Sequence, residues 1–208
     1  MMPQGATSAT GRARRSRKSD DGSRSQELLV ELEALFLAEG FSGLTIEELC
    51  SRLRCSKTTL YSVARSREQI IQKVTRHFFE RSTKAIEAGI TAIEDPADRI
   101  IRYLAGVGSA MSRNSRAFYL DMITYEPTAA IYRLNSRAAA RKVQGMIEDG
   151  VASGAFRAAD AALAGQAISL LIDGVQSGEL LEATGLTAGE AFTEIGELVI
   201  HGLTAKPQ

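Results

Sequence analysis

The feature that most constrains the fold is the near absence of proline from long amphipathic stretches. Pro occurs only at positions 3, 96, 127 and 207. Pro96 and Pro127 follow the acidic residues Asp95 and Glu126, an arrangement typical of the first turn of a helix. From residue 25 onward apolar side chains recur at helical spacing, and no stretch shows the alternation that indicates a strand. The sequence therefore predicts an all-α protein.

Capping signals and apolar stripes set the bounds of the expected helices. Gly40 closes the first helix, and Thr45 with Glu48 forms a capping box that opens the second. Ser66 and Gln69 form a further capping box, which opens a long fourth helix. Apart from the fourth helix, which begins after Ser66, the expected helices span residues 26–39, 46–53, 57–63, 96–111, 116–125, 127–150, 160–183 and 187–203.

Composition and charge narrow the class of protein. The 208 residues are 44% hydrophobic and 24% charged, which is typical of a globular chain. No run of about 18 apolar residues is present, so we expect no membrane span, and no apolar signal segment follows the basic N-terminal stretch. Residues 1–81 hold 14 Lys and Arg against 10 Asp and Glu, whereas residues 82–208 hold 11 against 15. The basic first part favours a polyanionic partner.

Residues 1–24 are predicted to be a disordered basic tail. They are rich in Ser, Gly, Ala and Arg and have no large aliphatic residue besides the first methionines, so they cannot bury a core. Two interpretations stay open: a solubilising extension, or an arm that touches DNA phosphate or the minor groove. The cations of this tail include Arg12, Arg14, Arg15, Arg17 and Lys18.

Two short helices joined by the turn at 54–56 have the layout of a helix-turn-helix. A recognition helix enters a major groove about 12 Å wide, so its first turn needs short polar donors and one or two cations. Leu60 and Val63 are expected to point into the core, while the helix start at Thr45 and the cations Arg54 and Arg67 can reach phosphates. The alternative is a plain three-helix packing unit with a polar face. The outward polar candidates are Lys57, Thr58, Thr59, Tyr61 and Ser62.

The same segment resembles the DNA-binding domain of TetR-type repressors. The resemblance is carried by the stretches Leu35–Phe41, Leu44–Leu49, Ser56–Tyr61 and Ser66–Glu68, within about residues 26–75. It implies a helix-turn-helix domain over 25–75 and a helical effector-binding and dimerisation domain over 76–208.

The resemblance also implies roles for single residues. Lys57 and Tyr61 would contact backbone phosphate, and Thr58, Thr59 and Ser62 would lie nearer base edges. Two residues depart from the family pattern. Arg54 stands where the family often has Gly, which costs more if φ is positive. Ala64 stands where the family usually has an aromatic residue, which predicts looser packing between the third and fourth helices.

Aromatic and methionine side chains gather in three consecutive helices of the second half. Met and Tyr suit an adaptable apolar pocket with a few polar groups, and the resemblance implies a ligand cavity in this region. The alternative is that these side chains form an ordinary core. The candidate pocket residues are Tyr103, Val107, Met111, Phe118, Met122, Tyr125, Tyr132 and Met146.

The helix expected over 160–183 is apolar around much of its circumference, so it must be buried on two sides. One side would face the core and the other a second copy of the chain, with the last helix completing a four-helix interface. The alternative is a monomer with an internal helical hairpin. The candidate interface residues are Leu163, Ala164, Ile168, Leu171, Ile172, Val175, Phe192, Ile195 and Val199.

No residue pattern indicates catalysis or a metal. Cys50 lies on an apolar stripe and Cys55 in a turn, so both are interpreted as small buried thiols rather than as a redox switch. His77 and His201 have no nearby carboxylate at metal-ligand spacing, and no nucleophilic triad or phosphate-binding glycine loop is present. We expect no catalytic residue, no metal and no cofactor.

These observations together predict a cytoplasmic, homodimeric transcriptional repressor. It would bind a pseudo-palindromic double-stranded DNA operator and be released by a small apolar effector of unknown identity. Two alternatives stay open: an enzyme with an accessory DNA-binding module, and a ligand-independent DNA-architectural or partner-binding protein.

Overall fold

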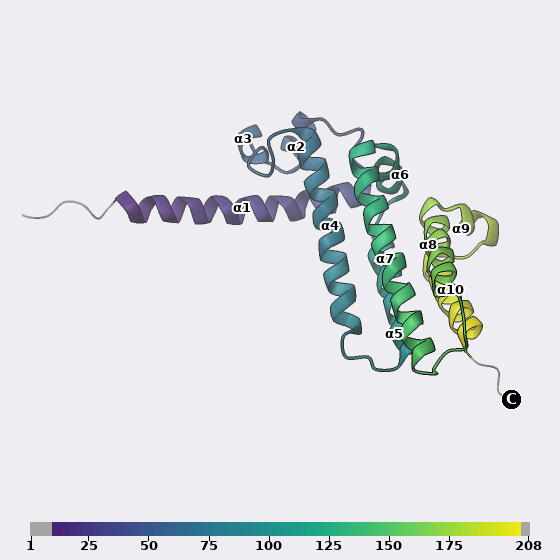
Figure 1. Cartoon of the computed structure of the whole chain (residues 1–208). Helices are drawn as coiled ribbons and strands as arrows, with labels where there is room; N and C mark the ends of the chain where they lie inside the picture. Colours follow the sequence, from purple (N-terminus) through teal and green to yellow (C-terminus); the bar gives the residue numbers. More distant parts are fainter. Residues whose placement is uncertain (1–9, 205–208) are drawn as a thin grey trace, which may run out of the picture.

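The computed structural model of the chain describes residues 10–204, with side chains from residue 23 onward (Figure 1). Within that range all the regular elements are helices, which confirms the all-α prediction. None of these helices is long and apolar enough to cross a bilayer. The helices are α1 (Thr10–Glu39), α2 (Ile46–Arg52), α3 (Lys57–Leu60), α4 (Arg67–Ile90), α5 (Pro96–Met111), α6 (Arg116–Thr124), α7 (Glu126–Ala152), α8 (Ala161–Ser177), α9 (Glu179–Thr184) and α10 (Ala188–Leu203).

The first helix begins earlier than the sequence predicts. Residues 1–24 were expected to be disordered, whereas α1 is helical from Thr10. The segment 10–24 is rich in Arg and Lys and contains no proline, so the packed part of α1 can propagate backward through it. Figure 1 shows this part of α1 projecting away from the other helices. Residues 1–9 of the expected tail lie outside the described residues.

A small apolar core holds α1 and α4 against the short helix α3. Leu28, Leu32 and Phe36 of α1 are buried, as are Leu60 of α3 and Ile70 of α4. The predicted stripes thus face inward at the expected spacing.

One buried carboxylate reinforces the contact between α1 and α4. Glu33 of α1 lies 2.6 Å from His77 Nδ1 and 3.4 Å from Arg81 Nη1 of α4. A buried charge is tolerated only when it is paired, and Glu33 meets that condition. Its partners both lie on α4, so these contacts fix how the two helices sit together.

The two predicted domains share a continuous core. The helix α4 runs unbroken through the expected boundary at residue 75. The ring of Phe118 on α6 packs edge-on against Phe41 at 6.1 Å and against Phe78 at 6.0 Å, measured between ring centroids. The N-terminal and C-terminal parts are therefore joined by packed aromatic side chains.

The C-terminal part is a bundle in which α4, α5, α7, α8 and α10 pack side by side (Figure 1). A close approach between α5 and α10 depends on Gly108, because a Cβ there would lie 2.8 Å from Cγ of Phe192. Phe192 of α10 therefore packs directly against the backbone of α5.

Three local predictions need correction. The helix expected over 160–183 is divided into α8 and α9 by Gly178, whose φ of +82° is a left-handed helix end that glycine adopts without strain. The helix expected to reach Val63 stops at Leu60. Gln69 accepts from the amide of Arg65 rather than from that of Ser66, so Ser66 caps α4 without a reciprocal box.

Candidate functional sites

Local hydrogen bonds cap the two helices of the helix-turn-helix. Thr45 Oγ1 accepts from the amide of Glu48, whose carboxylate accepts in return from the Thr45 amide at 2.8 Å. The bond from the Thr45 amide, followed by one from the Thr45 hydroxyl, lowers the pKa of the Glu48 carboxyl group. Ser56 Oγ accepts from the amide of Thr59 at 3.1 Å and so caps α3. The capping box at Thr45 is confirmed, and its hydroxyl is occupied by the cap.

The turn between α2 and α3 contains a strained residue. Arg54 has a φ of +48° and is the one non-glycine residue with positive φ in the part of the chain that the structure describes. Arg54 stood out in the sequence because the resembled family often has glycine at this position, and glycine adopts a positive φ at lower cost. Arg54 is exposed, so its guanidinium can reach solvent beside α3.

The short helix α3 presents its polar side chains outward. Lys57, Thr58, Tyr61 and Ser62 are exposed, while Leu60 is fully buried beneath them. Tyr61 exposes 40% of its surface. The predicted division between outward and inward residues is therefore confirmed for this segment except at Thr59, which is half-buried.

Some of these polar groups are already engaged in the free chain. Lys57 Nζ pairs with the carboxylate of Glu47 on α2, which raises the pKa of Lys57. Thr59 is half-buried and its hydroxyl lies 2.9 Å from that of Ser56, while Ser62 Oγ donates to the carbonyl of Thr59 at 2.7 Å. A DNA partner would have to exchange these contacts for its own.

The structure gives Arg67 a different role from the one predicted. Its guanidinium donates to the carbonyls of Leu44 at 2.9 Å, Phe41 at 2.7 Å and Ser42 at 3.3 Å. These three bonds tie the start of α4 to the segment before α2. Arg67 therefore positions the helix-turn-helix, and its donors are turned inward rather than toward a phosphate.

The two cysteines lie on either side of the same turn, half-buried against the core. Burial, followed by the neighbouring Cys50, raises the pKa of Cys55, which disfavours its thiolate. Across the described residues, no group of three His, Cys, Asp or Glu side chains is arranged to hold a metal.

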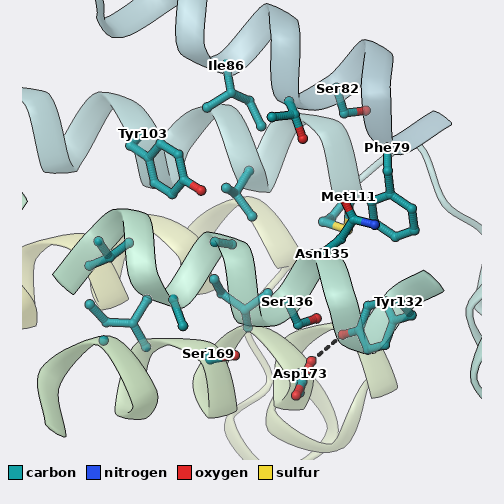
Figure 2. Close-up of a pocket in the computed structure, with 18 residues that line it drawn as sticks. Phe79, Ser82, Ile86, Tyr103, Met111, Tyr132, Asn135, Ser136, Ser169 and Asp173 are labelled. Atoms are coloured by element: carbon teal, nitrogen blue, oxygen red, sulfur yellow. Dashed lines mark hydrogen bonds between the residues drawn. The ribbon is translucent and has the colours of Figure 1, made fainter. Parts of the chain in front are cut away.

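A cavity of about 80 Å³ lies between α4, α5, α7 and α8 (Figure 2). Of the predicted pocket residues, Tyr103, Val107, Met111 and Tyr132 line it. The other four were wrongly assigned to it. The rings of Phe118 and Tyr125 pack against Phe41, while Met122 and Met146 are buried in the core outside the cavity lining. The remaining lining residues are Phe79, Ser82, Thr83, Ile86, Asn135, Ser136, Ala139, Ala140, Val143, Gly165, Ile168, Ser169, Ile172 and Asp173.

The sequence analysis missed the cavity's one charged lining residue. Asp173 of α8 accepts a hydrogen bond from the hydroxyl of Tyr132, drawn as the dashed line in Figure 2. It is the single charged residue in the α8 sequence Ala161–Ser177, and this isolated charge on an apolar helix could have revealed it. Burial, reinforced by Asp173, raises the pKa of Tyr132, and burial raises the pKa of Tyr103 to about 12.

Only part of the predicted dimer face is exposed. Ile168, Val175, Phe192 and Ile195 belong to the chain's own core, and Ile172 lines the cavity, so these five were wrongly assigned. They turn inward because α8 packs on α7 and α10 packs on α5. Ala164, Leu171 and Val199 are half-buried. The exposed leucines of α8 and α10 are Leu163 at 68%, Leu170 at 62% and Leu198 at 68%.

A carboxylate links the C-terminal bundle to the start of the helix-turn-helix. Asp121 Oδ2 of α6 accepts from the amides of Phe41 at 2.5 Å and Ser42 at 2.8 Å. On the same short helix, the ring of Tyr119 packs edge-on against that of Tyr132 at 5.9 Å. The helix α6 thus contacts both the cavity wall and the turn after α1.

The arrangement of helices matches that of solved transcriptional regulators. Neither a known family model nor a curated protein matches the sequence. A candidate transcriptional regulator from Saccharomonospora viridis, in complex with choline, has a TM-score of 0.76 at 18% identity, over 89% of this chain and all of that chain. A TetR transcription regulator from Haloarcula marismortui has a TM-score of 0.75 at 15% identity, over 88% of this chain and all of that chain.

A TetR-family regulator from Thermus thermophilus has a TM-score of 0.64 at 22% identity, over 86% of this chain and 99% of that chain. The chain has the TetR fold. The resemblance seen in residues 26–75 is therefore confirmed at the level of the fold, and it extends to the C-terminal helices, where the sequence carried no motif. In the TetR fold of this chain, α3 is the exposed polar helix and α8 and α10 carry the exposed leucines.

Proposed function

We propose that the protein is a TetR-type transcriptional regulator and not an enzyme. It acts as a homodimeric repressor that binds a pseudo-palindromic operator and releases it when a small ligand occupies the cavity. The observation that carries this proposal is the outward polar face of α3 on a chain with the TetR fold. Two copies related by symmetry would place their α3 helices in successive major grooves, about 34–36 Å apart.

The electrostatics of α2 and α3 suit a charged partner that binds reversibly. Lys57 is engaged by Glu47 in the free chain, but both side chains are largely exposed. Exposed ion pairs contribute little to stability, so a DNA phosphate can replace Glu47 at small cost. Lys57 would then contribute to affinity on any sequence, because phosphate contacts carry no base information.

Dimerisation is assigned to α8 and α10. Leu163 and Leu170 lie two helical turns apart on one face of α8, and Leu198 is equally exposed on α10. Exposed leucines on two adjacent helices are the pattern expected of a four-helix interface between copies.

Ligand control is assigned to α6. A ligand in the cavity would contact Tyr132, which packs against Tyr119, while Asp121 on the same helix holds the amides of Phe41 and Ser42. A shift of α6 would move the turn that precedes α2. Such a ligand can change DNA affinity only by its differential affinity for the two arrangements. The choline complex of the Saccharomonospora viridis regulator supports a small organic molecule as effector here.

The test begins with selection of the preferred duplex from random DNA, followed by binding measured across a range of salt. Lys57→Ala is expected to weaken binding on every sequence and to reduce the slope of log affinity against log salt by about 0.9, one counterion. Glu47→Gln frees Lys57 and is expected to strengthen binding. Lys84→Ala, which removes an exposed cation from α4, serves as the matched control and should leave the slope unchanged.

Two outcomes would contradict the proposal. An unchanged salt slope in Lys57→Ala would remove α3 from the DNA contact. Selection that yields no preferred sequence would favour the alternative of a ligand-independent architectural protein.

A further inference from the structure

The residues that line the cavity include one acidic side chain and no basic one. Among its lining residues Asp173 is charged, and none is Lys, Arg or His. The bond from Tyr132 satisfies one carboxylate oxygen without supplying a positive charge, and none of the ion pairs among the described residues includes Asp173. Tyr103 and Tyr132 are neutral near pH 7, as tyrosine ordinarily is, and burial raises the pKa of both further. A partly enclosed carboxylate without a cation is costly, which points to a cationic occupant.

Aromatic rings surround the same space from three helices. Phe79, Tyr103 and Tyr132 line the cavity from α4, α5 and α7, and the rings of Phe79 and Tyr132 lie 6.3 Å apart, centroid to centroid. Ring faces attract organic cations through their quadrupole, most strongly where water is excluded. Figure 2 shows Asp173 directed at Tyr132, so the carboxylate and an aromatic ring lie at the same place in the cavity.

The remaining lining groups limit the kind of cation. Ile168, Ile172 and Val143 are apolar and suit alkyl substituents, whereas Asn135 and Ser169 offer hydrogen bonds at separate points. No set of three metal-ligating side chains is formed by the described residues, so a metal ion does not fit. A volume of about 80 Å³ suits a small molecule.

We propose that the cavity recognises a small alkylated organic cation, held by Asp173 and by the rings of Phe79, Tyr103 and Tyr132. The proposal rests on the assignment of this cavity as the effector site, and it differs from the small apolar effector that the sequence predicts. Tyr132 fixes the orientation of the Asp173 carboxylate through its hydroxyl.

The test uses three probes of nearly the same shape and different charge: choline, its uncharged isostere 3,3-dimethylbutan-1-ol, and 3,3-dimethylbutanoate. Binding to the full-length protein is measured by calorimetry without DNA. Tyrosine emission gives a second signal, because the chain has five Tyr and no Trp. We expect choline to bind about tenfold or more tightly than the alcohol, and the carboxylate to bind least.

Asp173→Asn keeps an acceptor for the Tyr132 hydroxyl and removes only the charge. It is expected to abolish the preference for choline and to leave binding of the alcohol unchanged. Glu194→Gln removes an exposed charge from α10 and is the matched control, with the preference intact. Circular dichroism confirms that each variant is folded.

The proposal is overturned if choline binds no more tightly than the alcohol, if it fails to bind at millimolar concentration, or if Asp173→Asn retains the preference. These outcomes are independent of DNA binding, so they are distinct from a failure of the proposed regulatory function. Conversely, a cation that binds the cavity without changing DNA affinity would contradict ligand control and leave the cation site established.

Discussion

The surface of α2 and α3 and the surface of α8 and α10 are built in opposite ways. The first is polar, and its cation Lys57 is already paired with Glu47. The second exposes leucines, with 62% to 68% of the surface of Leu163, Leu170 and Leu198 accessible. Water solvates the first surface well, whereas each exposed leucine of the second forfeits burial energy of about 25 cal/mol per Å².

This difference indicates which partner each surface can accept. A polar surface with a displaceable ion pair suits a charged polymer that binds and leaves as salt and ligand change. An apolar surface on paired helices suits a permanent contact with another copy. Substitutions that reverse the character of one surface therefore test the comparison directly.

The largest effect is expected for the double variant Leu163→Glu, Leu170→Glu. Symmetry places four new carboxylates in the dimer interface, where they are desolvated and repel one another. The dimer dissociation constant is expected to rise about 100-fold or more, measured by sedimentation equilibrium. Leu134→Glu replaces an equally exposed leucine on α7 and should keep the wild-type mass. A dimer in the double variant would place the interface elsewhere.

A buried position on the same helix is expected to behave differently. Ile168 is 2% exposed and lies in the chain's own core. Ile168→Glu should therefore lower the melting temperature by unfolding the C-terminal bundle, rather than yield a folded monomer. A folded, monomeric Ile168→Glu protein would restore the original assignment of this residue to the interface.

An intermediate effect is expected for Asp121→Ala, which removes the link between the two parts. Two backbone amides, those of Phe41 and Ser42, lose their acceptor. The free energy of unfolding is expected to fall by about 2 kcal/mol in urea titrations. Asp149→Ala changes an exposed aspartate on α7 and should have almost no effect. Equal stability of the two variants would show that Asp121 does not hold the turn.

The smallest effect is expected at the strained turn. Arg54→Gly relieves a positive φ of +48°, so the free energy of unfolding should rise by about 0.5–1 kcal/mol. DNA affinity should fall at the same time, because the variant loses a cation beside α3. Arg54→Asn, which tolerates this backbone conformation, is expected to show the same pair of changes. A lower free energy of unfolding in both variants would show that contacts of the Arg54 side chain stabilise the fold.

The helix-turn-helix was predictable because its signals are local. Thr45 and Glu48 are three residues apart and form their capping box within one turn. Helical periodicity alone predicts that Leu60 faces the core and that the polar residues around it face solvent. The position of Arg54 was singled out by the resemblance, since the family often has Gly there, and its φ is +48°. Arg67 is the exception, since the carbonyls that it binds lie 23 to 26 positions away in the chain.

The cavity and the exposed apolar face were predictable only in part. The sequence identified Tyr103 and Tyr132 as pocket residues from their chemistry, yet it assigned Phe118 and Met122 in the same way. Aromatic and methionine side chains fill cores and line pockets alike. Only the packing of α6 against α1 and α4 assigns Phe118 to the core.

The sequence by itself determined that the chain is helical, where most helices begin, and that a short polar helix follows a tight turn, because caps and periodicity act over three or four residues. The tertiary structure decided which face of α8 turns inward, which side chains enclose the cavity, and that Asp173 meets Tyr132 there. Those outcomes depend on how helices far apart in the chain cross one another, and no local pattern encodes a crossing angle.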